Sequence, residues 1–570
     1  MEDLTVFEAS RLELPGACVW TGRCGDSDVI LAEGDGQALT KAGLQGGAPA
    51  GEYTVFPASY DNMLLWERRL APERRLLALN RSGYGAGFGA GNRVVVAWGD
   101  VPALQERRTL GAWDGIWRAM LQTSVPYWFV QQSIVRELIP EGVDAQKHPG
   151  IGHTGGYGPR ELLRAGLFAF ASLGGYSRYA LPIGADADHA IVVGHDEPAL
   201  QDSLAFNKLA MQESLDYTKF TVDVSHLFGF PVTLSRAEER RVLAIFRERQ
   251  FRIPNVLSDR IELAFEFDEA ETLRLAHKYW RAAAVHRELY DHAATVCQGR
   301  AFDYELSLDE TPEAMPPREL LFYLVLLEEA MGLPAGGVAS AGPNLGWAKR
   351  HDYEGDLGAL WEQTNACASI LQHRGAMLSV HSADGVSAWT GKGQGVDEVL
   401  AGTSRARLEL KVADVYQEVL WEVLQESPLP EERELFEEAW RRTLEAARGL
   451  ATVYRGTLAQ LDPQEALHAL ATPAGRERVA SQHGADALRL AQGAIGYGLA
   501  LFELASRLLE RTDPARPSAR DELFRRFMFL PYRSLRRSLF EVMTHDGWER
   551  FAEAVERATL LRTRAMGWSR

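Results

Sequence analysis

A six-residue stretch of the chain gathers two carboxylates and an imidazole directly after an apolar run. The stretch is Gly184-Ala185-Asp186-Ala187-Asp188-His189, and the apolar run before it covers residues 179–183. A strand that ends in such a cluster delivers polar side chains to one edge of a sheet. Carboxylate oxygen and imidazole nitrogen together suit a divalent transition metal better than calcium, which prefers oxygen ligands alone. The alternative is a turn whose aspartates are solvated and whose histidine caps a helix.

The same arrangement recurs along the middle of the chain. Eight apolar or glycine-rich runs alternate with helical stretches such as 161–173, 271–296 and 318–331. Strands that alternate with helices favour a parallel (β/α)8 barrel of the TIM type over an open sheet. In that fold the C-terminal ends of the strands meet at one rim, where the chemistry takes place. The runs are residues 83–89, 127–130, 179–183, 220–222, 302–308, 337–341, 377–380 and 396–400.

The two flanking parts differ from this middle part. Residues 1–80 hold short apolar pieces broken by glycine-rich turns and predict a small N-terminal β-rich leader. Residues 81–410 form the predicted catalytic barrel. Residues 411–570 are rich in Leu, Ala, Glu and Arg with helical periodicity, and predict a C-terminal α-helical extension. Its basic stretch, residues 525–537, indicates a salt-bridged helix face or a subunit contact. The sequence therefore predicts an α/β protein.

Composition limits the classes of partner. The net charge of −17, from 61 basic and 78 acidic residues, opposes binding to nucleic acid. The N-terminus is acidic, and no apolar run approaches the roughly 20 residues that span a bilayer, so we expect no membrane partner. Four scattered cysteines fit a reducing compartment. We expect a cytoplasmic protein with a small-molecule partner, and leave formation of a homo-oligomer open.

Eight short motifs occur in an order that resembles the tagaturonate epimerase family over roughly residues 80–415. The resemblance implies an isomerase, a metal-dependent sugar epimerase that converts fructuronate to tagaturonate, with neutral ketohexoses as analogues. The partner is then a small-molecule sugar or sugar acid. The motifs are residues 87–93, 131–133, 184–189, 220–223, 302–311, 352–357, 381–382 and 401–404.

The chain departs from the family pattern at several of these motifs. The family carries Gly-Asp-Arg where this chain has Asn92 before Arg93, and Asp397-Glu398-Val399 stands where members commonly carry His-x-Lys. In the family a lysine follows the His-Ser pair, but this chain has no lysine directly after His381 and Ser382. Two cations that could bind a substrate carboxylate are thus missing, and Lys349, Lys392, Arg405 or Arg93 could replace them. Another metal-dependent isomerase or aldolase, acting on a neutral or phosphorylated sugar, and a non-catalytic sugar-binding relative therefore stay open.

The implied reaction explains why such residues would collect at one rim. The inverted carbon is β to the ketone, so its hydrogen is not acidic and simple enolisation cannot invert it. Retro-aldol cleavage and re-addition needs a base on the β-hydroxyl and a Lewis acid on the ketone. The other route, transient oxidation, needs a nicotinamide, and the GxGxxA match at Gly85, Gly87 and Ala90 lacks the strand–turn–helix context of a dinucleotide site.

Roles follow for the polar residues at the predicted strand ends. Asp309 and Glu310 are the candidates for proton transfer, with Asp186 and Asp188 as alternates; salt bridging to rim arginines is the other interpretation. We expect Thr403 and Ser404, at a predicted helix start, to bind an anionic group. The candidate ligands of a divalent metal (Mn, Co, Ni, Zn or Fe) are His189, Asp223, His226 and His381, of which the last two could instead be structural. The candidate substrate-binding residues are Asn92, Arg93, Gln131, Gln132, Lys349, Ser382, Thr403 and Ser404.

Overall fold

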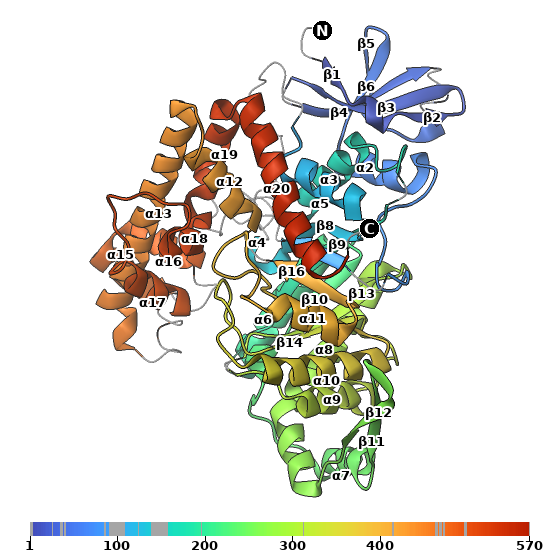
Figure 1. The fold of residues 1–570 in the computed structure, drawn as a ribbon, viewed down its shortest axis with the longest axis vertical. Coiled ribbons are helices and arrows are strands. Elements are labelled where there is room, and N and C mark those ends of the chain that lie inside the picture. The colour runs from blue at the N-terminus through green and yellow to red at the C-terminus, as the bar shows by residue number, and fades with distance from the viewer. Residues whose placement is uncertain are drawn as a thin grey trace.

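The computed structural model of the protein has three parts: an N-terminal sheet, a central ring of parallel strands and a group of C-terminal helices (Figure 1). This arrangement confirms the predicted α/β class with a β-rich leader and a helical extension. The structure describes residues 4–568 except 26, 35–37, 39–40, 85–86, 91–108, 124, 138–157, 180, 195, 312, 413–414, 462–465, 467–469, 471–472 and 495–498.

The N-terminal sheet is antiparallel, with the strand order β1-β3-β4-β6-β5 and with β2 paired to β3. Its two faces bury different side chains. Val19 and Ile30 belong to the main core, whereas Trp20 and Leu31, next to them in sequence, form a small separate cluster. This alternation is the two-residue period of a strand. The strands are β1 (Leu4–Val6), β2 (Leu12–Leu14), β3 (Ala17–Cys24), β4 (Ser27–Gly34), β5 (Ala48–Ala50) and β6 (Tyr53–Pro57).

Eight parallel strands form the central part, and their pairing closes in the order β10-β13-β14-β15-β16-β7-β8-β9. Every neighbouring pair in this circuit is parallel, so all C-terminal strand ends lie at the same end of the barrel. The strands are β7 (Gly87–Ala90), β8 (Tyr127–Ser133), β9 (Ile183–Ile191), β10 (Lys219–Asp223), β13 (Asp303–Leu308), β14 (Ser340–Pro343), β15 (Met377–Val380) and β16 (Leu408–Val412).

Two of the predicted strands are wrong. The cluster 184–189 does not follow a strand at 179–183 but lies within β9. Asp186 and Asp188 alternate there with Ala185 and Ala187, and all four are buried. The apolar run at 179–183 therefore does not mark this strand, because the interior face of the strand is polar and its outer face is made of alanine.

Residues 396–400, the second error, form the start of helix α11 (Val396–Ser404). Val396, Val399, Leu400 and Thr403 are buried along it, which is the spacing of a helix face. The eighth strand is instead β16, whose end at Val412 lies beyond the predicted barrel end at residue 410.

Helices and one hairpin fill the connections between these strands. The long connection from β10 to β13 carries α7, the hairpin β11–β12 and α8, and extends to the bottom of the molecule in Figure 1. Helix α2 (Tyr60–Leu65) precedes the first barrel strand. The elements in the connections are α3 (Ala112–Thr123), α4 (Ile134–Glu137), α5 (Pro159–Ser172), α6 (Glu197–Glu213), α7 (Arg236–Phe246), β11 (Phe251–Asn255), β12 (Ser258–Phe265), α8 (Glu269–Cys297), α9 (Pro317–Val325) and α10 (Leu357–His373), with α11 last.

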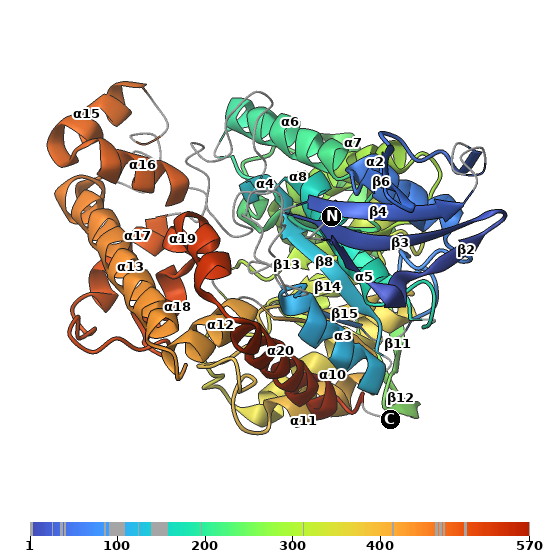
Figure 2. The ribbon, with the colours of Figure 1, turned by 90° about the horizontal axis from the view of Figure 1, so that it is seen from above.

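The C-terminal helices pack on the barrel through their inner members. Gly115 of α3 brings that helix close to α20, since a Cβ there would lie 2.3 Å from the Ala552 carbonyl oxygen. Figures 1 and 2 show α13, α15, α16 and α17 on the side of the extension away from the barrel. No described helix is both long and apolar enough to cross a membrane. The helices are α12 (Val415–Gln425), α13 (Pro430–Gly456), α15 (Pro473–His483), α16 (Ala485–Ala494), α17 (Leu499–Leu508), α18 (Glu522–Phe527), α19 (Phe529–Val542) and α20 (His545–Ala565).

Candidate functional site

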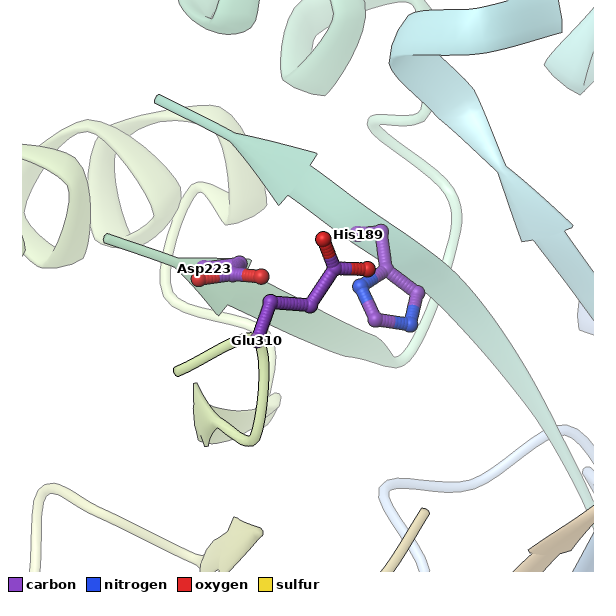
Figure 3. A group of neighbouring side chains, drawn as sticks. All are labelled: His189, Asp223 and Glu310. Atoms are coloured by element: carbon purple, nitrogen blue, oxygen red, sulfur yellow. The ribbon is translucent and has the colours of Figure 1, made fainter. Parts of the chain in front are cut away.

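Three side chains from consecutive barrel strands meet at the C-terminal end of the barrel. His189 lies near the end of β9, Asp223 is the last residue of β10, and Glu310 follows β13. One ligand atom from each lies within 4.8 Å of the others, and Figure 3 shows the three side chains pointing toward one another. The set offers one imidazole nitrogen and two carboxylate oxygens, a combination that suits a divalent transition metal.

A β-bulge aims the histidine of this group. Phe220 pairs with Ala187 and Val222 pairs with Ala190, so two residues of β9 oppose the single residue between Phe220 and Val222. His189 is one of the two, and its φ of 56° lies in the left-handed region that non-glycine residues rarely adopt. A bulge re-aims a side chain in this way, and bulges are frequent next to functional sites.

The surroundings of Asp223 indicate whether a cation fits this group of three residues. Its side chain is buried; one carboxylate oxygen accepts from the Ser225 amide at 2.8 Å, and Oδ2 has no hydrogen-bond partner among the described residues. Burial, together with the neighbouring Glu310 and Asp309 charges, raises the pKa of Asp223 to about 8. A divalent cation would satisfy the orphaned oxygen and offset the repulsion, so the residues present fit a metal.

The other two predicted ligands lie outside this group of ligand atoms. His226 is about half exposed, and its Nε2 lies 3.9 Å from Glu310 Oε2. His381 is buried between two carboxylates: its Nε2 lies 2.7 Å from Glu305 Oε1 and its Nδ1 3.0 Å from Asp309 Oδ1. Burial opposes its charge, but Asp309 and Glu305 raise the pKa of His381 to about 10. Both ring nitrogens are thus engaged by carboxylates.

Asp309, predicted to transfer protons, is held by its neighbours. The Ser307 hydroxyl donates to Asp309 Oδ1 at 2.8 Å, and His381 contacts the same oxygen. Burial opposes ionisation of Asp309, but the His381 charge outweighs burial and holds the pKa of this carboxyl below its ordinary range. Asp309 is therefore a carboxylate at neutral pH.

The alternates for proton transfer, Asp186 and Asp188, belong to a network of charges inside the barrel. Lys411 Nζ lies 2.8 Å from Asp186, 3.3 Å from Asp188 and 2.7 Å from Glu305. Burial opposes the charges of Asp188 and Glu305, yet the surrounding cations hold the pKa of each carboxyl well below its usual range. The same carboxylates raise the pKa of Lys411 against the effect of burial.

A second lysine completes this network on its other side. Lys219 Nζ lies 2.7 Å from Glu305, also pairs with Glu409, and stands 4.1 Å from the centre of the Trp128 ring. Burial and the nearby Glu305 raise the pKa of Glu409 to about 8. Glu305 thus links both lysines to His381, and through His381 to Asp309.

Four members of this network were missed at the sequence level: Lys219, Glu305, Glu409 and Lys411. Each lies in a strand where every second residue is polar, as in Lys219-Phe-Thr-Val-Asp223 and Asp303-Tyr-Glu-Leu-Ser307. That two-residue period indicates a strand with a polar inward face. The signal was therefore present in the sequence, hidden by the assumption that barrel interiors are apolar.

A cavity of about 720 Å³ opens beside the three-residue group. His189, Asp309, Glu310 and His381 form one wall, and the segment after β14 forms another. Two predicted substrate-binding residues, Lys349 and Ser382, line it. The full lining is His189, Asp309, Glu310, Thr311, Glu313, Ala314, residues 343–349, His381 and Ser382.

Gln131 and Gln132, also predicted to bind substrate, contact other parts of the barrel. Gln131 donates to Asp188 at 3.3 Å, and Gln132 accepts from the Tyr217 hydroxyl at 3.0 Å. Neither is among the residues that line the cavity. Asn92 and Arg93 lie outside the described residues.

The prediction for Thr403 and Ser404 is wrong in its premise. These residues end α11 rather than start it, and their buried hydroxyls donate to the carbonyl oxygens of Val399 and Leu400 at 2.6 and 2.5 Å. The helix begins at Val396 because Gly395, at φ 83°, allows the chain to turn there. A helix start that could bind an anion is therefore not present at residues 403–404.

Fold and site together define a parallel-barrel protein with a candidate metal centre at the C-terminal strand ends. The tagaturonate epimerase family model matches residues 161–399. This match confirms, over that part of the chain, the resemblance found in the sequence. None of the curated protein sequences matches the chain.

Solved structures of one family member share the fold along the whole chain. The native and one-glycerol structures of fructuronate-tagaturonate epimerase UxaE from Cohnella laeviribosi each match with a TM-score of 0.58 at 20% identity, covering 99% of this chain and 96% of that chain. The two-glycerol structure gives 0.57 at 19% identity, with coverages of 99% and 97%. At this identity the likeness establishes a common fold.

Proposed function

We propose that the protein is a metal-dependent sugar epimerase that inverts the carbon β to the ketone of a ketouronate, interconverting fructuronate and tagaturonate. The observation that carries the proposal is the meeting of His189, Asp223 and Glu310 beside a cavity of about 720 Å³, in a chain whose residues 161–399 match the tagaturonate epimerase family model. Such a volume lies in the usual range of small-molecule sites. We interpret the closed strand circuit as a (β/α)8 barrel whose chemistry lies at this rim.

The three residues His189, Asp223 and Glu310 would hold a divalent cation at the edge of the cavity. A divalent cation bound there would supply Lewis acidity toward the ketone oxygen of the sugar. The chain itself supplies two carboxyl groups and one imidazole as ligands, and the Ser225 amide fixes the orientation of Asp223. Glu310 is the most exposed of the three, so its side chain can shift as substrate enters.

Proton transfer is assigned to Asp309, which faces the cavity as a carboxylate. It takes the proton of the β-hydroxyl while the bond between the α and β carbons breaks, which leaves an enolate and an aldehyde. The aldehyde turns over, the bond re-forms on its other face, and Asp309 returns the proton. Because His381 holds the pKa of Asp309 low, Asp309 is ionised but is a weak base. It can therefore act as the base only beside a Lewis acid that makes the substrate easier to deprotonate.

Lysine chemistry offers a different route to the same cleavage, through an imine. Lys219 and Lys411 carry raised pKa values because buried carboxylates surround them, despite burial, and neither is among the residues that line the cavity. An ammonium group is not a nucleophile. This observation favours the metal route over the imine route.

The substrate carboxylate is assigned to Lys349 on the cavity wall. One observation supports a second candidate, an epimerase of neutral ketohexoses: the described lining holds three carboxylates, Asp309, Glu310 and Glu313, against this one lysine. Anionic substrates are repelled by such a wall unless a cation and His381 balance it.

The test combines metal analysis with a substrate scan. The purified protein is loaded with Mn²⁺, Co²⁺, Ni²⁺ or Zn²⁺ and incubated with fructuronate, fructose, tagatose and sugar phosphates. We expect metal-dependent conversion of fructuronate, lost after chelation and restored by metal. Equal rates for the stripped and loaded protein would refute the proposal. Binding of a sugar without turnover under all four metals would instead support a non-catalytic relative.

Variants identify the ligands in the same experiment. We expect His189→Ala and Asp223→Asn to lose bound metal, and His226→Ala to retain it, because His226 is about half exposed and lies outside the group. Asp202→Asn, a change of the same type at an exposed position of α6, serves as the matched control for Asp223→Asn. Full metal content in Asp223→Asn would refute the ligand assignment.

A further inference from the structure

The cavity wall formed by the segment after β14, residues 344–351, is held by side chains from later parts of the chain. Its inner side carries Trp347 and Lys349, which line the cavity. Its main-chain carbonyl groups accept hydrogen bonds from side chains that belong to later parts of the chain. The segment also contains Arg350 in the left-handed region, at φ 59°, a conformation that costs on the order of 1 kcal/mol and persists only when surroundings hold it.

One of the holding side chains comes from the C-terminal extension. Arg526 of α18 donates from Nη2 to the carbonyl oxygen of Lys349. The guanidinium is half-buried, and the sequence distance between the partners is 177 residues. A hydrogen bond from a charged donor is stronger than one between neutral groups. It therefore fixes the main chain at the residue whose side chain is assigned to the substrate carboxylate.

The neighbouring residue of α18 secures the helix against the barrel. Arg525 is buried, donates to the Gly385 carbonyl oxygen at 3.1 Å and pairs with Glu418 of α12 at 2.8 Å. Glu418 in turn accepts from the Ala388 amide at 2.9 Å. The extension thus contacts the segments after β14 and after β15, which flank the cavity, and Figures 1 and 2 show α12 and α18 between α13 and the barrel.

A lysine of the barrel acts on the same wall from a second direction. Lys392 is fully buried and donates to the carbonyl oxygens of Ala348 and His351 at 2.6 and 3.1 Å. Together with Arg526, it gives carbonyl groups on both sides of Arg350 a charged donor. This arrangement offsets the cost of the left-handed residue and leaves the wall with one defined shape.

We propose that Arg526 is a positioning residue of the substrate site, through which the C-terminal extension sets the place of Lys349 in the cavity. The proposal rests on the proposed function, because it takes the cavity as the place where the sugar binds. It assigns a task to a basic stretch that the sequence alone described only as a helix face or subunit contact. The residue acts through the wall and does not line the cavity itself.

The experiment compares Arg526→Gln and Arg526→Lys with the wild type and with Arg537→Gln. Arg537 lies on the next helix of the extension, is largely exposed and pairs within its own helix with Glu541 at 2.8 Å, so it is a matched control. Two quantities are measured on metal-loaded full-length protein: hydrogen–deuterium exchange of peptides covering 344–351, and kcat and KM with fructuronate. Metal content and thermal midpoint are recorded for each variant.

We expect Arg526→Gln to speed exchange in 344–351 and to raise KM about ten-fold, the effect of one lost charge-assisted hydrogen bond, with kcat and metal content unchanged. Arg526→Lys should lie between it and the wild type, and Arg537→Gln should match the wild type. Unchanged exchange in 344–351 in Arg526→Gln would overturn the proposal, as would a fall in kcat and metal content without a change in KM. If the wild type does not convert any of the sugars, the proposed function fails, and the exchange data alone still decide whether Arg526 holds the wall.

Discussion

Removal of the Lys411 charge is expected to destabilise the barrel more than removal of any exposed lysine. Methionine keeps the length of the side chain, so Lys411→Met removes the charge without opening a large cavity. Lys411 is 4% exposed, and its partners Asp186 and Glu305 are fully buried. Breaking a buried ion pair by removing one partner costs about 3–5 kcal/mol, because the remaining charge stays buried without compensation.

Lys208→Met provides the matched control. Lys208 Nζ lies 2.6 Å from Glu288, but the two side chains are 34% and 39% exposed. Ion pairs of this kind contribute less than about 1 kcal/mol. Urea-induced unfolding followed by tryptophan fluorescence would compare both variants with the wild type at pH 7. Equal losses in the two variants would refute the electrostatic account of the barrel interior.

The pH dependence of this loss gives a second check. In the wild type, three cations overcome the effect of burial and hold the pKa of Glu305 low: Lys219, Lys411 and His381. The stability that the ionised Glu305 contributes to the folded state is therefore present at pH 7 and is lost only in acid. Without Lys411, burial raises the carboxyl pKa values, and the folded state takes up protons that the unfolded state does not. The deficit of Lys411→Met should therefore shrink as pH falls from 7 to 5, by up to about 1.4 kcal/mol per unit. A deficit that is constant with pH would contradict this reasoning.

Three further changes test separate parts of the structure. Metal affinity should fall about ten-fold per pH unit below about 8. Burial raises the pKa of Asp223 to about 8, and the protonated carboxyl does not bind a cation. Calorimetric titration with Mn²⁺ would show the fall, and an affinity that does not change with pH would contradict this prediction. Gly342→Ala places a carbon 2.8 Å from His381 Nε2, so turnover of fructuronate should fall roughly ten-fold or more with metal content kept; unchanged turnover would remove His381 from the mechanism. Ser235→Ala deletes the capping box with Glu238 and should destabilise α7 by about 1 kcal/mol, measured by amide exchange in that helix, where equal protection would count against the cap.

The helical and antiparallel parts of the fold follow from local patterns in the sequence. Glycine-rich turns between short apolar pieces predicted the N-terminal sheet, and the 3.6-residue period predicted the extension. Residues 396–400 form part of a helix, although their apolar run predicts a strand. Val396, Val399 and Leu400 have helical spacing. Short apolar runs do not separate the two structures unless the period is counted.

The candidate site could be predicted only in part, because its composition depends on register. His189 and Asp223 were expected to share a metal, and Glu310 was expected nearby in another role. Which side chains meet depends on the bulge that rotates His189 and on the parallel register between β10 and β13, and neither is encoded in a local pattern. His381 is a histidine at a strand end, as His189 is, but both of its ring nitrogens contact carboxylates, those of Glu305 and Asp309.

The charges below the candidate metal centre are better explained by positioning than by stability. Well-packed apolar residues are often as stable as a buried ion network or more so. Glu305 is the residue at which the network meets the site, since it contacts Lys219, Lys411 and His381. The lysines fix Glu305, Glu305 fixes one nitrogen of His381, and the other nitrogen contacts Asp309 at the cavity. Arg526 and Lys392 hold the wall that carries Lys349. The proposed base is thus held by His381, which the two buried lysines position through Glu305, and the wall that carries the proposed carboxylate-binding lysine is held by Arg526 and Lys392. The separation of the two groups is therefore set before a sugar binds.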